Sequence, residues 1–114
     1  MTLAIGVAVF TTLVPALTQT SSRSFGRMVA GLSAPEREAI RRAQREVLEK
    51  AQPGALSVWT DEKTGHSGEA RIRRTYQQNG MPCAEVEHVL KVRDVSQFTL
   101  PFCRTSDGMW RLAY

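Results

Sequence analysis

The sequence is poor in residues that bind metal ions. Its 114 residues include two cysteines, Cys83 and Cys103, and two histidines. A structural zinc site needs four ligands at suitable spacing, and no such cluster occurs, so we expect no metal and no other cofactor. The first mature residue of a lipoprotein is a cysteine, and no cysteine precedes Cys83. The sequence as it stands therefore excludes acylation at such a site.

Common catalytic motifs are absent as well. The sequence has neither the G-x-S-x-G nor the S-x-x-K pattern of serine nucleophiles, and it has no G-x-x-x-x-G-K phosphate loop. His66 lies in a segment typical of a turn, where we expect an exposed side chain. His88 has the parity of a core residue, and we expect it to be half-buried with one hydrogen bond. These observations predict a protein that is not an enzyme.

Charge of one sign is not in large excess. The formal net charge is +4, with 15 basic and 11 acidic residues. Arg23 and Arg27 precede the expected domain, and without them 13 basic residues face 11 acidic ones. This balance is too even for a nucleic-acid-binding surface, so we expect no nucleic-acid partner. The arginines near residue 41 are interleaved with glutamates, which predicts a solvated helix face.

A hydrophobic run of membrane-spanning length is also missing. The run from Leu3 to Leu13 is shorter than the roughly 20 residues that cross a bilayer. It is followed by Val14-Pro15-Ala16, which fits a signal peptidase site, although no Lys or Arg precedes it. We expect residues 1–16 to be a signal peptide or an N-terminal membrane anchor, with an ordinary core element as the third reading. The Ser- and Thr-rich residues 17–31 read as a flexible linker.

One helix and several strands are expected after this linker. Ser33 and Glu36 have the spacing of a capping box, and apolar residues then recur at helical spacing until Gln52-Pro53-Gly54 ends the helix. The hydrophobic period then changes to two, with glycine-containing turns between the segments. The expected strands are residues 55–60, 69–76, 83–92, 98–104 and 109–114. The predicted fold is α+β, with one N-terminal amphipathic helix packed on a four- to five-stranded antiparallel meander.

The parity of the strands predicts a disulfide. In the third strand Ala84 to Val92 place alternate apolar residues on one face, as do Phe98 to Phe102 in the fourth strand. Cys83 and Cys103 fall on the opposite face of both strands. If the register places them opposite one another, a cross-strand disulfide can form, and an exported protein favours it. The alternatives are two free buried thiols or a metal-binding pair.

A candidate interaction surface follows from the same parity. Charged residues lie on the face away from the helix, and tryptophans could add a stacking platform, although core or rim positions suit them as well. The candidate residues are Trp59, Arg71, Arg73, Glu85, Glu87 and Trp110.

Many of these residues occur in an order that resembles a known pattern. A leucine and a serine open the charged helix, a tryptophan and a T-G-x-x-G segment follow, and a C-R-x-x-D-G-x-W segment comes last. The residues that carry the pattern are Leu32, Ser33, Trp59, Thr64, Gly65, Gly68, Tyr76, Cys83, Cys103, Arg104, Asp107, Gly108 and Trp110.

The pattern resembles the surface antigen domain of the rickettsial seventeen-kilodalton surface antigen family, which occurs in envelope proteins of Gram-negative bacteria. The resemblance covers residues 32–114 and implies an exported, non-enzymatic envelope domain with paired cysteines at Cys83 and Cys103. The chain departs from the family because it lacks the lipobox cysteine and the Gly-rich hydrophobic segment, and because Ala84 follows the first cysteine.

The expected function is a structural or protein-interaction role in the cell envelope, in the periplasm or at the outer membrane or cell surface. An envelope protein would be the partner, and residues 1–16 would allow membrane association. The alternative is a periplasmic module that binds a small ligand or inhibits an enzyme.

Overall fold

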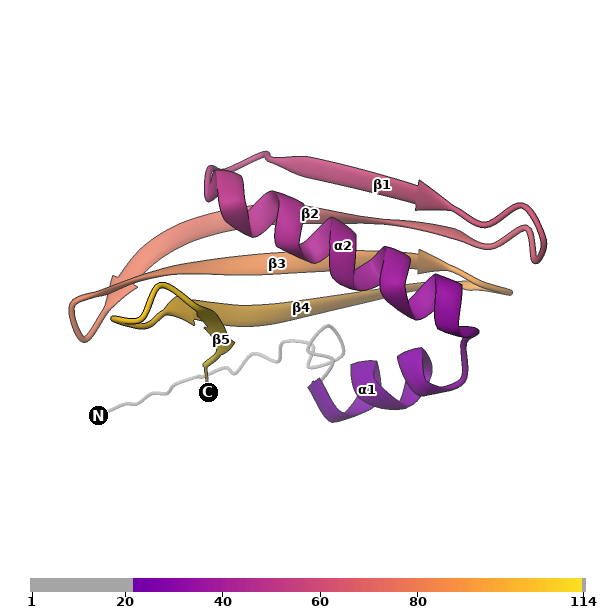
Figure 1. The fold of residues 1–114 in the computed structure, drawn as a ribbon, viewed down its shortest axis with the longest axis horizontal. Coiled ribbons are helices and arrows are strands. Elements are labelled where there is room, and N and C mark those ends of the chain that lie inside the picture. The colour runs from indigo at the N-terminus through magenta and orange to yellow at the C-terminus, as the bar shows by residue number, and fades with distance from the viewer. Residues whose placement is uncertain (1–21, 114) are drawn as a thin grey trace, which may run out of the picture.

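The computed structural model describes residues 22–113, which form two helices and one five-stranded sheet. The elements follow one another along the chain (Figure 1) as α1 (Ser22–Ala30), α2 (Ala34–Lys50), β1 (Leu56–Thr60), β2 (Ser67–Gln78), β3 (Met81–Lys91), β4 (Val95–Arg104) and β5 (Trp110–Leu112). The strands are antiparallel and lie in the order of the sequence. The predicted α+β class and the meander are confirmed.

A flexible linker was predicted for residues 17–31, and the described part of this range, from residue 22, instead forms the helix α1. Phe25, Met28 and Val29 are spaced by three and one residues, so they share one side of α1, and they pack against the hydrophobic core. The Phe25 ring lies 5.2 Å from the ring of Phe98 on β4. Burial of these side chains stabilises a helix of 9 residues that is too short to be stable alone.

The predicted signal peptide or anchor, residues 1–16, lies outside the described residues. Within residues 22–113, neither helix combines the length and the apolar character needed to cross a membrane.

The capping box at the start of α2 is confirmed. The backbone N–H of Glu36 donates to the Ser33 hydroxyl at 3.3 Å, and the Ser33 N–H donates to the Glu36 carboxylate at 2.9 Å. The helix ends at Lys50 and is capped by Ala51, whose φ of 47° is left-handed and prevents another helical turn. Both ends of α2 are thus set by local residues, close to the expected bounds.

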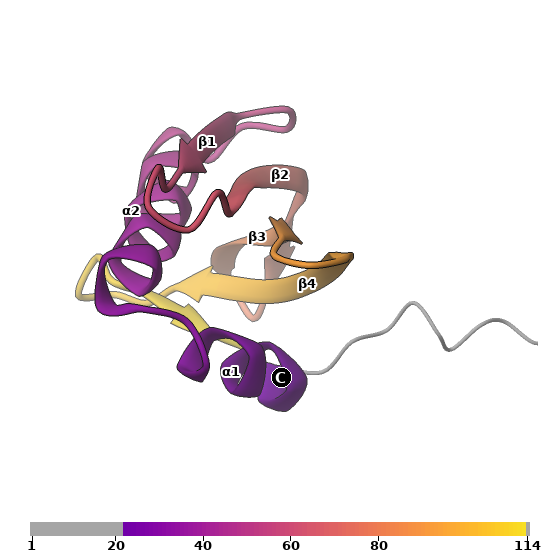
Figure 2. The same cartoon turned by 90° about the vertical axis from the view of Figure 1, so that its right-hand side faces the viewer.

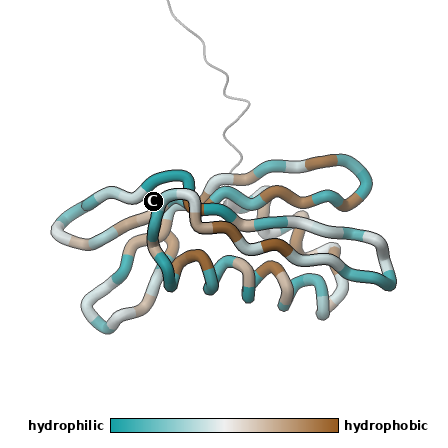
Figure 3. The backbone as a smooth tube through the Cα atoms, turned by 90° about the horizontal axis from the view of Figure 1, so that it is seen from above, coloured by the Kyte–Doolittle hydropathy of each residue, from teal (hydrophilic) through white to brown (hydrophobic). Residues whose placement is uncertain are grey.

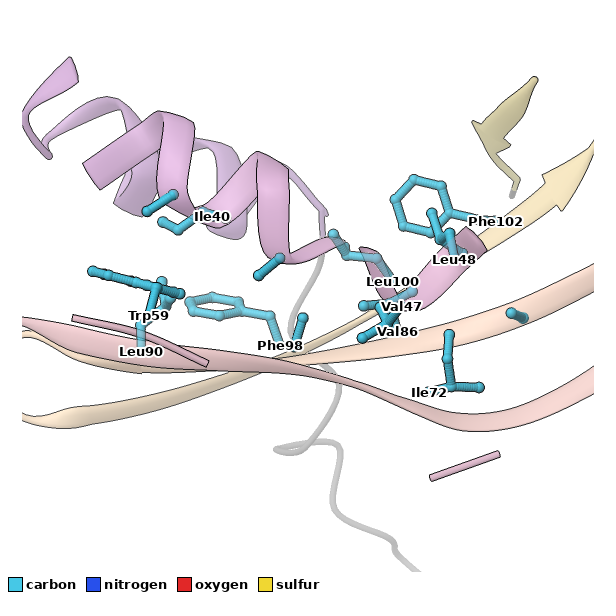
Figure 4. Close-up of a cluster of buried hydrophobic side chains, with 14 of the residues drawn as sticks. Ile40, Val47, Leu48, Trp59, Ile72, Val86, Leu90, Phe98, Leu100 and Phe102 are labelled. Atoms are coloured by element: carbon cyan, nitrogen blue, oxygen red, sulfur yellow. The ribbon is translucent and has the colours of Figure 1, made fainter. Parts of the chain in front are cut away.

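The apolar stripe of α2 covers one face of the sheet, which we call the inner face (Figure 2). Figure 3 shows hydrophobic and hydrophilic residues alternating along the strands and around α2, and Figure 4 shows the side chains that meet between the two layers. The expected inner-face parity of β3 and β4 is confirmed. The largest buried side chains of this core come from α2 (Ile40, Val47, Leu48) and from the strands (Trp59, Ile72, Val86, Leu90, Phe98, Leu100, Phe102).

The two cysteines form the predicted disulfide. Cys83 of β3 lies directly opposite Cys103 of β4, and their sulfur atoms are bonded. Both residues are buried but are not part of the core cluster. In the same row of the sheet, Tyr76 of β2 pairs with Cys83, and Arg111 of β5 pairs with Cys103. The bridge therefore joins the central strand β3 to its neighbour β4 on the outer face, away from α2.

Trp59 lies directly over Gly68, its partner in the antiparallel register of β1 and β2. A Cβ atom at Gly68 would lie 2.7 Å from the indole Nε1 of Trp59 and 2.7 Å from the carbonyl oxygen of Val89. Real Cβ atoms do not approach this closely. The missing side chain at Gly68 is what lets the indole ring lie flat against the sheet, where Trp59 is 4% exposed.

Removal of the disulfide should destabilise the fold. The double variant Cys83→Ser/Cys103→Ser is expected to lose about 3 kcal/mol of unfolding free energy, because a bridge over a separation of 20 residues restricts the unfolded chain by about that much. Urea denaturation measures the loss. Reduced wild-type protein should unfold at the midpoint of the variant, and an oxidised wild type no more stable than the variant would contradict the expectation.

Gly68→Ala should lower the free energy of unfolding by about 1 to 3 kcal/mol, because the new methyl group displaces Trp59 from a packed site. Thermal unfolding and the tryptophan emission maximum would be measured together, since displacement exposes the indole. Gly26→Ala in α1 is the matched control: a Cβ there meets nothing within 4 Å, and alanine should stabilise the helix. Equal stability of Gly68→Ala and wild type would refute the close-contact explanation.

Candidate functional site

The six residues predicted as an interaction surface do not share one face of the sheet. Trp59 is 4% exposed and belongs to the core, so its assignment to the surface is wrong. Glu87 is also buried, at 6% exposure. Trp110 is half-buried against the core at the other end of the sheet. Sequence parity cannot distinguish a covered tryptophan from one at the rim, because that depends on where α2 lies.

The charged residues of the outer face pair with one another across neighbouring strands. An Arg71 guanidinium nitrogen lies 2.5 Å from a carboxylate oxygen of Glu87, and Arg74 lies 3.1 Å from Glu85. Arg73 is exposed and is the extra residue where the register shifts between Ile72 and Arg74. A partner on this face would have to compete with the Arg71–Glu87 and Arg74–Glu85 pairs.

A groove on the helix side of the molecule offers a better candidate. It consists of two hollows, of about 460 and 450 Å³, that share Gln44 and Phe102. The first is lined by residues from the end of α2 and the turn before β5, and the second by residues from α1, α2, β4 and the end of β5. We define the groove by its α2 rim (Arg37, Arg41, Gln44, Arg45), its floor (Ile40, Leu48, Leu100, Phe102) and its opposite side (Arg104, Met109, Trp110, Leu112).

Glu38 holds two of the arginines on the α2 rim. Its carboxylate lies 3.4 Å from Arg41 and 3.2 Å from Arg45, and all three side chains are more than half exposed. The hydrogen bond from Arg45, together with the charges of Arg45 and Arg41, holds the pKa of Glu38 below its ordinary value. Exposed pairs of this kind contribute little to stability, so the arginines can exchange partners at small cost.

The turn between β4 and β5 is held by Asp107. The Thr105 hydroxyl, the backbone N–H of Met109 and the Arg111 guanidinium all donate to the Asp107 carboxylate. These hydrogen bonds lower the pKa of the Asp107 carboxyl to about 2, and the one from Thr105 has the largest effect, followed by those from Met109 and Arg111. The turn therefore holds the backbone of Met109, whose side chain is 54% exposed at the edge of the groove.

His88 lies beneath the groove and is fully buried, not half-buried as expected. Its Nε2 lies 2.9 Å from the side-chain oxygen of Gln44, so Nε2–H donates and Gln44 is fixed at the junction of the two hollows. The Phe25 ring packs on the imidazole at 4.8 Å. Nδ1 has no hydrogen-bond partner among the described residues. Burial lowers the pKa of His88 to about 4, which keeps the imidazole neutral.

His66 is part of a second cluster and is not the exposed loop residue that was expected. Its Nδ1 lies 2.5 Å from the buried carboxylate of Glu36, which also accepts from the Thr64 hydroxyl at 2.7 Å. Burial raises the pKa of Glu36, but hydrogen bonds from the Ser33 backbone, Thr64 and His66 outweigh burial and lower it to about 2. The cluster ties the loop between β1 and β2 to the start of α2.

No residues in the described part of the chain form a candidate metal centre, since no three His, Cys, Asp or Glu side chains gather at one place. Of the predicted site residues, the structure brings together Cys83 with Cys103 and Arg71 with Glu87. Sequence reasoning missed the groove, although the spacing of Arg37, Arg41 and Arg45 by four residues was visible. Arg41, Arg42 and Arg45 were interpreted as a solvated helix face, because which arginines line a groove depends on the tertiary fold.

Comparison with protein-family models, with curated proteins and with solved structures found no match. The resemblance to the surface antigen domain therefore remains a prediction from sequence.

The buried His88 should make the protein sensitive to mild acid. The unfolded chain binds a proton near the ordinary pKa of 6.5, whereas the folded chain binds it only near 4. Stability should therefore fall as the pH drops from about 6.5 to about 4, by up to about 3 kcal/mol. Glu36 acts in a lower window, because its contribution is present above pH 4.5 and is lost towards pH 2.

Urea denaturation between pH 7 and pH 4.5 measures this slope, with His88→Phe as the test variant. Phenylalanine keeps an aromatic ring beside Phe25 but cannot bind a proton, so the variant should lose most of the dependence in this range. The same slope in wild type and variant would show that another group causes the sensitivity.

Proposed function

We propose that this protein is an exported domain of the cell envelope with a non-catalytic role, and that it binds another protein through the groove between α2 and β5. It would work in the periplasm or at the outer membrane or cell surface, as the resemblance to the surface antigen domain implies. Residues 1–16 would direct export and allow membrane association.

The observation that carries the proposal is the Cys83–Cys103 disulfide. Disulfides form and persist in oxidising compartments and are rare in the cytosol, so a cross-strand bridge is compatible with export. It closes a long β3–β4 hairpin on the face opposite α2. A small domain that relies on such a bridge would be stable outside the reducing cytosol.

The groove supports an interaction role over catalysis. Its α2 rim is basic, its floor is apolar, and Met109 and Leu112 on its other side are 54% and 44% exposed. Exposed apolar side chains beside charged ones are typical of protein contact sites. The one pairing of histidine with carboxylate found in residues 22–113, His66 with Glu36, has a structural use in joining a loop to α2.

A periplasmic ligand-binding module is the second candidate. Each hollow of the groove has a volume of about 450 Å³, which lies within the range of small-molecule sites. Trp59 and His88 do not support this reading, because both are covered by the core and neither lines the groove.

The proposal predicts export with oxidised cysteines. The full chain would be produced in a Gram-negative host, and the intact mass of the protein in each cell fraction measured after thiol alkylation, with and without reduction. We expect the protein in the periplasmic or envelope fraction, with two alkyl groups added only after reduction. Deletion of residues 2–16 is the control and should leave the protein in the cytoplasm. Full-length protein in the cytoplasm with two reactive thiols would overturn the proposal.

A further inference from the structure

The groove joins a row of positive charges to an apolar floor. Arg37, Arg41 and Arg45 line its α2 rim, and Arg104 lies on the opposite side. Glu49 is the acidic residue among those lining the two hollows. From this arrangement, and resting on the proposed function, we propose that the groove binds an extended segment of another protein in which acidic and apolar residues alternate.

Arg41, Arg45 and Arg104 have exposed side chains that such a segment can reach, whereas Arg37 is half-buried and donates to the carbonyl oxygen of Leu32. Arg41 and Arg45 share one carboxylate, Glu38, in an exposed arrangement. Arg104 is exposed and has no ion-pair partner within residues 22–113. A partner carboxylate that displaces Glu38 would meet the guanidinium groups of both Arg41 and Arg45. Arginine binds carboxylates with paired, charge-assisted hydrogen bonds, so acidic side chains fit this rim.

The spacing of the rim matches an extended chain. Arginines four residues apart on α2 are separated by about 6 Å along the helix axis. Side chains on one side of an extended chain repeat every two residues, at about 6.7 Å. Acidic residues at every second position can therefore meet Arg41 and Arg45 in register. A partner helix could present acidic residues at the same axial spacing, but two adjoining hollows below the arginines favour a chain in which acidic and apolar side chains alternate.

The apolar side of the groove can accept the apolar residues that alternate with the acidic residues of the partner segment. Two hollows that adjoin at Gln44 and Phe102 suit two successive apolar side chains better than one enclosed ligand. Phe102, where the two hollows adjoin, lies beside Leu48 (Figure 4). In an extended segment the apolar side chains point away from the acidic ones. The floor side chains are at most 5% exposed, so the apolar contacts would be made mainly with Met109 and Leu112, which are 54% and 44% exposed, while the acids meet the arginines.

The test uses labelled synthetic peptides and the oxidised full-length protein. The probe is a nine-residue peptide in which glutamate alternates with valine and leucine. One control peptide has lysine in place of glutamate, and another has the same composition with all glutamates in one block. Fluorescence anisotropy should show binding of the alternating probe alone, with an affinity that weakens as the salt concentration rises.

The variants separate the rim from the rest of α2. The double variant Arg41→Glu/Arg45→Glu should bind the probe at least about tenfold more weakly. Arg42→Glu is the matched control, because Arg42 is exposed on the same helix but does not line the groove. Met109→Ser should also weaken binding, whereas Val58→Ser, at an exposed valine of β1, should not. Circular dichroism checks that each variant is folded.

Three outcomes would overturn the inference. Equal binding of the alternating and block peptides would exclude an extended register, and a loss with Arg42→Glu as large as with the double variant would exclude the rim. Binding of phosphatidylglycerol vesicles without binding of the probe would identify a lipid as the occupant. Failure of any of these tests leaves the export experiment unaffected, whereas cytoplasmic, reduced protein would overturn the proposed function even if the probe binds.

Discussion

The packing of α2 on the inner face of the sheet is the contact on which the other features depend. Ile40, Val47 and Leu48 of α2 meet apolar side chains from β2, β3 and β4. Because strand residues alternate between faces, this contact fixes which residues are covered and which face solvent. It also places the start of α2 beside the β1–β2 loop and its last turns beside β5. One apolar stripe thereby positions both the Glu36 cluster and the groove.

The two faces of the sheet contribute to stability in different ways. The outer face carries cross-strand ion pairs and the disulfide, which connect neighbouring strands without a covering layer. Between the inner face and α2 lie the core and two buried polar residues, Glu36 of α2 and His88 of β3, which differ in charge. Glu36 stays charged because several donors point at it. His88 stays neutral because it has one partner, Gln44, and no compensating charge.

The groove exists because β5 is short and α1 packs at some distance from it. β5 pairs with β4 over three residues only, from Phe102 to Arg104. A hollow therefore remains between α1, α2 and Leu112, and Leu100 and Phe102 at its base are 3% and 5% exposed. The side chains on its borders are those that the packing of α2 leaves at the rim. Its chemistry, arginines over an apolar floor, is therefore a consequence of the same helix placement that builds the core.

Local and periodic patterns in the sequence determined much of the fold. Ser33 and Glu36 set the start of α2, and the period-two pattern set the inner and outer faces of β3 and β4, including the common face of Cys83 and Cys103. These features depend on residues close in the chain or on strict alternation, so they can be predicted from sequence. The turn after β3 was harder to predict because residues 92–98 lack Gly and Pro, and β4 begins earlier than expected, at Val95.

Only the tertiary structure decided the burial and the hydrogen-bond partners of side chains that contact residues distant in the sequence. His66 lies 30 residues from Glu36, and Gln44 lies 44 residues from His88. Trp59 is buried because Gly68 leaves room for its ring. The helix α1 is stabilised because Phe25 packs against His88 and Phe98. Such contacts depend on how the layers are placed in space, and neither composition nor periodicity encodes that placement.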